Sequence, residues 1–395
     1  MEFSGTAGYQ IMNVSENSKG SILITGDTYL AGGRVAEPAM SCDVELLFGS
    51  FMPLIEKADL AITNLESPLI DDGIPVLKTG PSLKSPVESI NVLKEAGFGL
   101  VTLANNHIMD YGENGLEQTL EACNNNGINT VGAGLNSVEA SKPFIVKLKD
   151  ITIGILNIAE NEFGASENGE PGGHAMDPVQ NFYAIQKASE IADHVIVIVH
   201  GGHEHFELPS PRMKKTYRFF ADAGASAVIS HHTHCPCGYE KYNGVPICYS
   251  LGNFLFDRAG KQLSGPTPWN EGLIAELLIS KHKLDVQYHP YIQNHITPGL
   301  RKMSKVELQS FSLKMERANE IIGDDNRLEE EFENYCKRSY RMYRGFVEPH
   351  SNRLLHALRN RNLAPSMLSK KKKRLLLNLA RCEAHRDVLI KTLST

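Results

Sequence analysis

Three histidines stand within four positions of the segment VISHHTHCPCGYE, residues 228–240. They are His231, His232 and His234, and they follow directly on an apolar run. Imidazole is the commonest side-chain ligand of protein-bound metals, so the segment is a candidate metal site. A catalytic metal site takes about three protein ligands, however, and one short segment cannot close it. Further ligands must therefore come from other parts of the chain.

Metal-ligating side chains also close several other apolar runs. Each run is rich in β-branched residues, and a carboxylate, an amide or an imidazole stands within one to three residues of its end. These residues are Asp27, Asn64, Glu66, Asn105, Asn106, His107, His200, His232 and His234. Such groups ligate divalent ions such as manganese, iron or zinc. A single polar residue at a strand end is usually structural, but the recurrence at five strand ends favours a metal site.

The apolar runs alternate with helical patterns, and this order predicts an α/β fold. The expected strands cover residues 21–27, 58–66, 99–107, 151–160, 194–202, 225–234 and 245–254. Helical patterns lie between several of them, at residues 85–97, 112–127 and 210–224. Continuous apolar strands are typical of sheets buried on both faces, so helices should cover the sheet and ligands should gather at the carboxyl ends of its strands.

The three clustered histidines should not all face the same way. If the segment is extended, alternate side chains point to one face, so His232 and His234 should point together and His231 should point away. We therefore expect His231 either to be structural or to support a ligand without binding the metal itself.

Composition limits the class of protein. The 395 residues are 42% hydrophobic and 22% charged, which predicts a globular chain with a core. The first 20 residues lack the apolar segment of a secretory signal, and no apolar run is long enough for a transmembrane segment. Seven cysteines without framework spacing favour reduced thiols over disulfides or a zinc ribbon. We expect a cytoplasmic protein with no sequence-specific nucleic-acid partner, since it has no signature of a nucleic-acid-binding module.

The net charge of −6 is unevenly distributed. Residues 301–395 carry 21 Lys and Arg against 12 Asp and Glu, whereas residues 1–300 carry 19 against 34. This change predicts two parts, a domain at residues 20–298 and a basic helical C-terminal region at residues 299–395. Within that region, Lys370–Arg374 is either a solvated helix start or a contact for an anionic polymer or a membrane surface. The second alternative would place the protein peripherally at the membrane.

The chain resembles the capsule synthesis protein family of poly-γ-glutamate CapA type, a branch of the calcineurin-like metallophosphoesterases. The resemblance covers about residues 20–295 and rests on six motifs in order, GDTYLAG, TNLESPL, LANNHIMDYG, HGGHE, DAGASAVISHHTH and YSLGNFLFD. It implies a four-layer α/β/β/α metallophosphoesterase-like sandwich, here with a C-terminal helical extension. It also implies one or two bound divalent ions, of manganese, iron or zinc.

The resemblance also implies roles for individual residues. One metal would be held by Asp27, Glu66 and His234, and the other by Glu66, Asn106, His200 and His232. His107 would be the general acid that protonates the leaving group, and Asp110, three residues on, is the nearest carboxylate that could orient it. The substrate pocket would be lined by Asn64, Glu204, Asn253 and Asp257.

Three residues depart from the wider superfamily or from the family. Tyr29 stands where the superfamily has a histidine, and the bridging carboxylate is Glu66 where the superfamily has Asp. Gly201 stands where the family has Trp, so the pocket wall is either more open or filled from elsewhere. The missing histidine leaves one metal site a ligand short, and a mononuclear centre is an alternative.

Two functions of different class follow. The first is a metal-dependent, phosphoesterase-like hydrolase that acts on a cell-envelope polymer or its precursor in capsule or exopolysaccharide biosynthesis. The second is a non-catalytic, polymer-binding accessory subunit of capsule or poly-γ-glutamate assembly, with capsule-assembly proteins bound through the C-terminal helices. A general acid at His107 favours the enzyme, whereas Tyr29 favours the accessory subunit.

Overall fold

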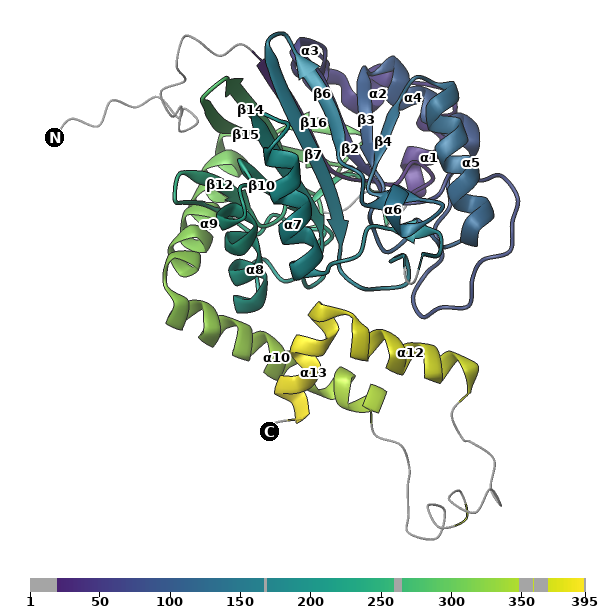
Figure 1. The fold of residues 1–395 in the computed structure, drawn as a ribbon, viewed down its shortest axis with the longest axis vertical. Coiled ribbons are helices and arrows are strands. Elements are labelled where there is room, and N and C mark those ends of the chain that lie inside the picture. Colours follow the sequence, from purple (N-terminus) through teal and green to yellow (C-terminus); the bar gives the residue numbers. More distant parts are fainter. Residues whose placement is uncertain (1–19, 167–168, 259–264, 348–357, 359–368, 394–395) are drawn as a thin grey trace, which may run out of the picture.

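The computed structural model describes residues 20–166, 169–258, 265–347, 358 and 369–393. Two β-sheets pack face to face, and helices cover the outer face of each sheet (Figure 1). The predicted four-layer α/β/β/α sandwich with a C-terminal helical extension is therefore confirmed.

The larger sheet has the strand order β16-β15-β14-β1-β2-β3-β4, with β13 also paired to β1. Strands β1, β2, β3 and β4 run parallel, whereas β14 pairs antiparallel with β1. Its strands are β1 (Gly20–Thr28), β2 (Leu60–Leu65), β3 (Phe98–Thr102), β4 (Asn129–Val131), β13 (Asn253–Leu255), β14 (Glu271–Ser280), β15 (Lys283–Gln293) and β16 (Leu300–Lys302). The sequence-based expectation did not include β4, β14, β15 or β16.

The smaller sheet has the order β11-β12-β10-β9-β7-β6. Its strands are β6 (Phe144–Leu148), β7 (Ile151–Ala159), β9 (His194–His200), β10 (Ala227–His231), β11 (Tyr239–Tyr242) and β12 (Val245–Cys248). The short strands β5 (Ala133–Gly134) and β8 (Gly172–Gly173) pair with each other beside the two sheets.

Alternation along the strands supplies the apolar layers. In β1, Ile22 and Ile24 face the core between the sheets, whereas Leu23 between them packs under the helices on the outer face. Val197 and Ile198 of β9 divide between an outer and the inner layer in the same way. Burial on both faces is the physical reason for continuous apolar runs in these strands.

Helices on the larger sheet are α1 (Ala36–Met40), α2 (Val44–Phe48), α3 (Met52–Lys57), α4 (Asn91–Glu95) and α5 (Gly112–Asn125), with the short 3₁₀ turns η1 (Gly33–Val35), η2 (Gly49–Phe51) and η3 (Val87–Ile90). The smaller sheet is covered by α7 (Pro178–Ser189) and α8 (Pro211–Asp222). A short helix, α6 (Ser137–Ala140), lies against β5.

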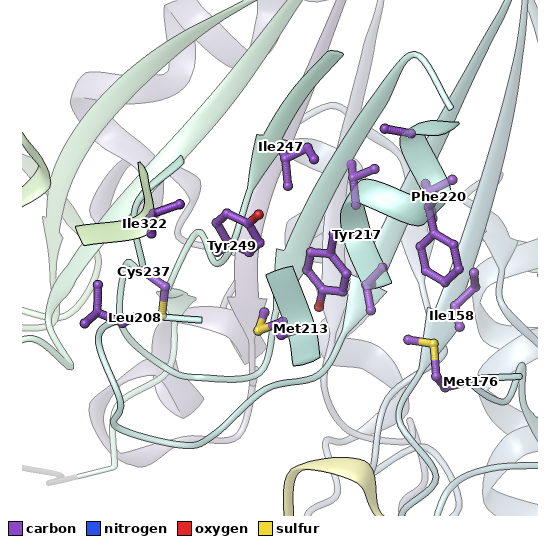
Figure 2. Close-up of a cluster of buried hydrophobic side chains, with 14 of the residues drawn as sticks. Ile158, Met176, Leu208, Met213, Tyr217, Phe220, Cys237, Ile247, Tyr249 and Ile322 are labelled. Carbon is purple, nitrogen blue, oxygen red and sulfur yellow. The ribbon is translucent and has the colours of Figure 1, made fainter. Parts of the chain in front are cut away.

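The C-terminal helices pack on the smaller sheet and its helices. They are α9 (Lys305–Gly323), α10 (Asp325–Val347), α12 (Lys370–Arg381) and α13 (Glu383–Leu393). Figure 2 shows Ile322 of α9 within the apolar cluster that also holds Tyr249 and Leu208. Met315 and Phe311, about two and three turns earlier in α9, are buried in the core between the sheets. The proposed boundary at residue 299 stays a prediction.

None of the described helices combines the length and the apolar character that a membrane crossing requires.

Candidate metal centre

The parallel strands bring the predicted ligands to one edge of the sandwich. Asp27 of β1 lies beside Asn64 of β2 in the larger sheet. In the smaller sheet, His200 ends β9 beside His231, which ends β10. Because parallel strands end at the same edge, the residues that follow them are also neighbours.

Glu66 lies at the centre of the group. Its side chain is fully buried, and neither carboxylate oxygen has a hydrogen-bond partner among the described residues. Oε1 lies 3.8 Å from Nε2 of His200 and 3.8 Å from Nε2 of His234. Burial, together with the charge of Asp27, raises the pKa of this carboxyl well above its ordinary value. An isolated buried carboxylate surrounded by imidazoles is the environment that a cation would satisfy.

Two sets of possible ligands share Glu66. One consists of Glu66, His200 and His232, and the other of Asp27, Glu66 and His234; within each set the ligand atoms lie within 4.8 Å of one another. Asn106 joins the first set, since its Oδ1 lies 3.1 Å from Nε2 of His200. That nitrogen also lies 3.0 Å from Nδ1 of His232.

The buried imidazoles are held in the form that binds metals. Burial lowers the pKa of His200 well below its ordinary value, and the neighbouring His232 adds to the effect. Burial likewise lowers the pKa of His234. A neutral imidazole has a nitrogen lone pair for an ion, so both residues suit a cation at neutral pH.

The loop after β10 is tighter than the sequence suggested. The extended conformation expected for it is wrong, because His232 and His234 have φ angles of 94° and 58°. The turn nevertheless directs both side chains to the centre, where the backbone N–H of His232 donates to Asp27 at 3.0 Å. His231 points away, and its Nε2 lies 2.8 Å from the carbonyl oxygen of Thr25.

Two buried amides support the ligands. Asn64 donates to Oδ1 of Asp27 at 2.7 Å and lies 3.3 Å from Nδ1 of His200. Oδ1 of Asn253 lies 2.8 Å from Nδ1 of His234, which leaves Nε2 of that ring directed to Glu66. Such contacts fix the orientation and tautomer of ligating side chains. Both residues, predicted to line the substrate pocket, are fully buried among the ligands.

The other two pocket residues are not members of the two ligand sets found among the described residues. The side chain of Glu204 is half exposed, and its Oε2 lies 3.9 Å from Nε2 of His205. Burial alone would raise the pKa of this carboxyl, but the nearby His234 and His232 lower it. Asp257 is buried and accepts a 2.7 Å bond from Nε of Arg34. Glu204 is therefore accessible to a large ligand, whereas Asp257 is engaged in an ion pair.

His107 and Asp110 form a buried pair beside the centre. Nδ1 of His107 lies 2.7 Å from Oδ2 of Asp110. Nζ of Lys78 lies 3.2 Å from the same ring nitrogen and also bonds Asp110. Sequence reasoning missed Lys78, which stands in a segment without a periodic pattern, so no local signal indicated it.

Glu160 and Glu162 were also missed, although they follow β7 just as the predicted ligands follow their strands. Glu160 explains the glycine at position 201, because a Cβ added there would lie 2.6 Å from Cγ of Glu160. Burial alone would raise the pKa of Glu160, but a 2.7 Å ion pair with Arg212 holds it below the ordinary value. The pocket wall is thus filled from β7.

Comparisons with known proteins agree on one family. The family model described as "Bacterial capsule synthesis protein PGA_cap" matches residues 21–258, a range that includes every predicted site residue. The capsule biosynthesis protein CapA of Bacillus anthracis is 30% identical over 252 residues, which are 62% of this chain and 61% of that protein. The PGA biosynthesis protein CapA of Bacillus subtilis (strain 168) is 34% identical over 217 residues, 54% of this chain and 57% of that protein. The chain therefore spans less than two thirds of either relative.

Among solved structures, the 5'-nucleotidase from Candida albicans SC5314 is similar with a TM-score of 0.40 at 11% identity. The similarity covers 78% of this chain and 58% of that one.

Proposed function

The chain belongs to the bacterial capsule synthesis protein family PGA_cap, and from this premise we propose that it is a metal-dependent, phosphoesterase-like hydrolase of capsule or exopolysaccharide biosynthesis. Its substrate would be a cell-envelope polymer or a precursor of one. The family match confirms the resemblance that the six motifs indicated. All seven cysteines are free thiols, which supports a reducing, cytoplasmic compartment.

The observation that carries the proposal is the isolated carboxylate of Glu66 between His200 and His234. Its two oxygens lack hydrogen-bond partners among the described residues, and leaving a charged group buried without a partner is costly. Among the described residues, the donors around it are carboxylate, amide oxygen and imidazole, without a thiolate. This set suits manganese, iron or zinc, as one or two ions.

The chemistry follows from the residues around that group. A divalent ion bound there would polarise a substrate oxygen and activate water. Asp110 fixes His107 through Nδ1, which leaves Nε2 as the donor of a proton to the leaving group. Lys78 bonds the same carboxylate and holds it in place. Glu204, half exposed, would contact the polymer outside the reacting bond.

Two variants separate the general acid from a ligand. His107→Ala should keep its metal but lose about 10²–10⁴-fold in turnover, most for substrates with poor leaving groups, since these depend on protonation. His200→Ala should lose metal and turnover together, because it removes a ligand. Metal content by elemental analysis and rates on a panel of phosphodiester and amide substrates, with manganese present, measure both effects. A fully active His107→Ala, or one that has lost its metal, would contradict the assigned role.

The second candidate is an accessory subunit that binds polymer without cleaving it. Tyr29 favours it, because its ring packs on Phe256 with centroids 5.2 Å apart and supplies no imidazole ligand. The basic start of α12 offers a contact for an anionic polymer or for capsule-assembly proteins. A metal-loaded wild type that binds polymer but cleaves no member of the panel would favour this candidate.

A further inference from the structure

Helix α13 lies outside the family match, which ends at residue 258, and contacts the segment that follows β7. In Figure 1, α12 and α13 lie below the sandwich, on the side toward which β7 runs. Three side chains of α13 contact either the segment after β7 or Arg212, which pairs with Glu160 of that segment. Glu383 accepts from the side chain of Asn161 at 2.6 Å, and His385 pairs with Glu162 at 2.9 Å. Asp387 pairs with Arg212 at 2.6 Å.

Glu162 connects this helix to a proposed ligand. Its side chain is buried and bonds Nε2 of His385 at 2.9 Å; burial alone would raise the pKa of its carboxyl, but His385 and, to a smaller extent, His232 and Asn106 hold that pKa below its ordinary value. Nδ1 of His385 lies 2.8 Å from the hydroxyl of Tyr343 in α10. An unbroken series of contacts therefore runs from α10 through α13 to Asn106.

The position of Glu162 beside Asn106 matters because an amide has an oxygen that accepts and a nitrogen that donates. A metal can bind only the oxygen of Asn106, and Oδ1 faces His200 at 3.1 Å. The amide nitrogen then needs an acceptor on its other side, and the carboxylate of Glu162, whose pKa Asn106 helps to lower, is the acceptor that this proposal assigns to it. Without a fixed acceptor, the amide could rotate and present its N–H₂ group to the ion.

We propose that His385 is a positioning residue of the metal centre. By holding Glu162, it keeps Asn106 turned with its oxygen toward His200 and His232, so the C-terminal helices complete a site that the sandwich strands begin. This inference rests on the proposed function, because it requires that Asn106 bind a metal.

An alternative use of the same residues is a separate ion site, since ligand atoms of Glu162, Cys382 and His385 lie within 4.8 Å of one another. The contacts favour positioning. Nε2 of His385 is paired with Glu162 and Nδ1 lies 2.8 Å from the hydroxyl of Tyr343, so both nitrogens of the ring already have partners.

Titration of the metal-free protein with Mn²⁺ tests the proposal without any substrate. His385→Ala should keep the wild-type number of bound ions while its Kd rises about 10–100-fold, the usual effect of removing such a supporting contact. Tyr343→Phe, which removes only a hydroxyl, should shift the Kd in the same direction by less. Glu162→Gln should bind better than Glu162→Ala, because glutamine keeps an acceptor for Asn106.

The matched control lies on the same helix. Lys391→Ala removes ion pairs with Glu329 and Glu333 and should leave the Kd unchanged. An unchanged Kd in both His385→Ala and Tyr343→Phe would overturn the proposal. So would the loss of one ion with the affinity of the others intact, which would indicate a separate ion site. A wild type that binds no Mn²⁺ would refute the proposed function itself, and this inference with it.

Discussion

At the scale of single residues, two features of the proposed metal centre lower the stability of the fold. Glu66 is buried without hydrogen bonds among the described residues, and His232 and His234 adopt positive φ angles that residues with a Cβ rarely adopt. Costs of this kind persist where surrounding structure holds them, and they gather at functional sites. An ion bound by Glu66 would offset the cost of burying its carboxylate.

Replacing Glu66 should change the free energy of unfolding in opposite directions with and without metal. In the metal-free protein, Glu66→Gln should raise the free energy of unfolding by about 1 kcal/mol or more, because the wild type must either bury this carboxyl charged or take up a proton on folding, and a neutral amide does neither. With Mn²⁺ present, the wild type should be the more stable of the two, since only it binds the ion. Chemical denaturation with chelator and with Mn²⁺ measures both differences. A variant that is less stable in chelator would contradict the cost assigned to Glu66.

His174 gives the protein a dependence of stability on pH. Its Nδ1 lies 3.0 Å from the carbonyl of Asn157 and its Nε2 lies 3.1 Å from the amide of Asn181, and burial lowers its pKa to about 4. Between about pH 6.5 and pH 4, the unfolded chain therefore binds a proton that the folded protein does not. The stabilisation is present above about pH 6.5 and is lost as the pH falls to about 4, by up to about 3 kcal/mol.

His174→Gln should flatten that dependence, because glutamine can bond both partners but does not titrate. Unfolding free energies at several pH values between 7 and 4 would measure the slope, with the exposed His282→Gln as control. Identical slopes for wild type and His174→Gln would rule out this residue as the cause.

At the scale of elements, the C-terminal helices differ in what they bury. Phe311 and Met315 of α9 lie in the core between the sheets, whereas α12 and α13 pack on the outer cluster of the smaller sheet. Lys214 of α8 also bonds the last turn of α9 and pairs with Asp325 at 2.6 Å. The sandwich and α9 therefore share apolar contacts.

A core substitution in α9 measures how closely this helix is tied to the sandwich. Phe311→Ala should destabilise the whole fold by about 3–5 kcal/mol, because it removes a buried ring from the layer between the sheets. Val306→Ala, on the exposed face of the same helix, should change stability by no more than about 0.5 kcal/mol. Denaturant unfolding followed by tryptophan fluorescence of Trp269 reports on the sandwich. An unchanged midpoint for Phe311→Ala would support an independent unit beginning near residue 299.

At the scale of the whole molecule, the centre joins the two sheets. Asp27 and Glu66 come from the larger sheet and its following loop, whereas His200 and His232 come from the smaller. An ion bound between them would cross-link the layers at one edge, in addition to the apolar core that joins them over their faces.

Metal binding should therefore stabilise both sheets together. At a free Mn²⁺ concentration 100 times the Kd, the gain should be about 2.7 kcal/mol. Calorimetry should show one unfolding transition that moves to higher temperature as Mn²⁺ is added, with no such movement in Glu66→Ala. Two transitions, of which only one responds to Mn²⁺, would show that the ion does not couple the layers.

The sequence predicted the parts of the fold and site that depend on local pattern. Apolar runs ending in Asp27, Glu66 or His200 indicated strands and the edge where they meet, because burial on both faces leaves a continuous signal. It could not predict the pairing of His385 with Glu162, since residues 223 positions apart carry no common period. The role of Lys78 could not be predicted for a related reason, because only folding brings its loop to Asp110.

Strand β1 has consequences for how such sequences change during evolution. Its first half is held by ladder bonds to β14, where Ile22 pairs with Leu277, and β14 lies outside the family match. Backbone groups make those bonds, so selection can accept many apolar residues in β14 as long as volume is kept. Asp27, at the other end of β1, acts through its side chain, so selection cannot accept other residues at this position in the same way. Relatives should therefore keep an antiparallel strand at this position even where its sequence no longer resembles that of β14. A search by sequence would then place the end of their domain too early.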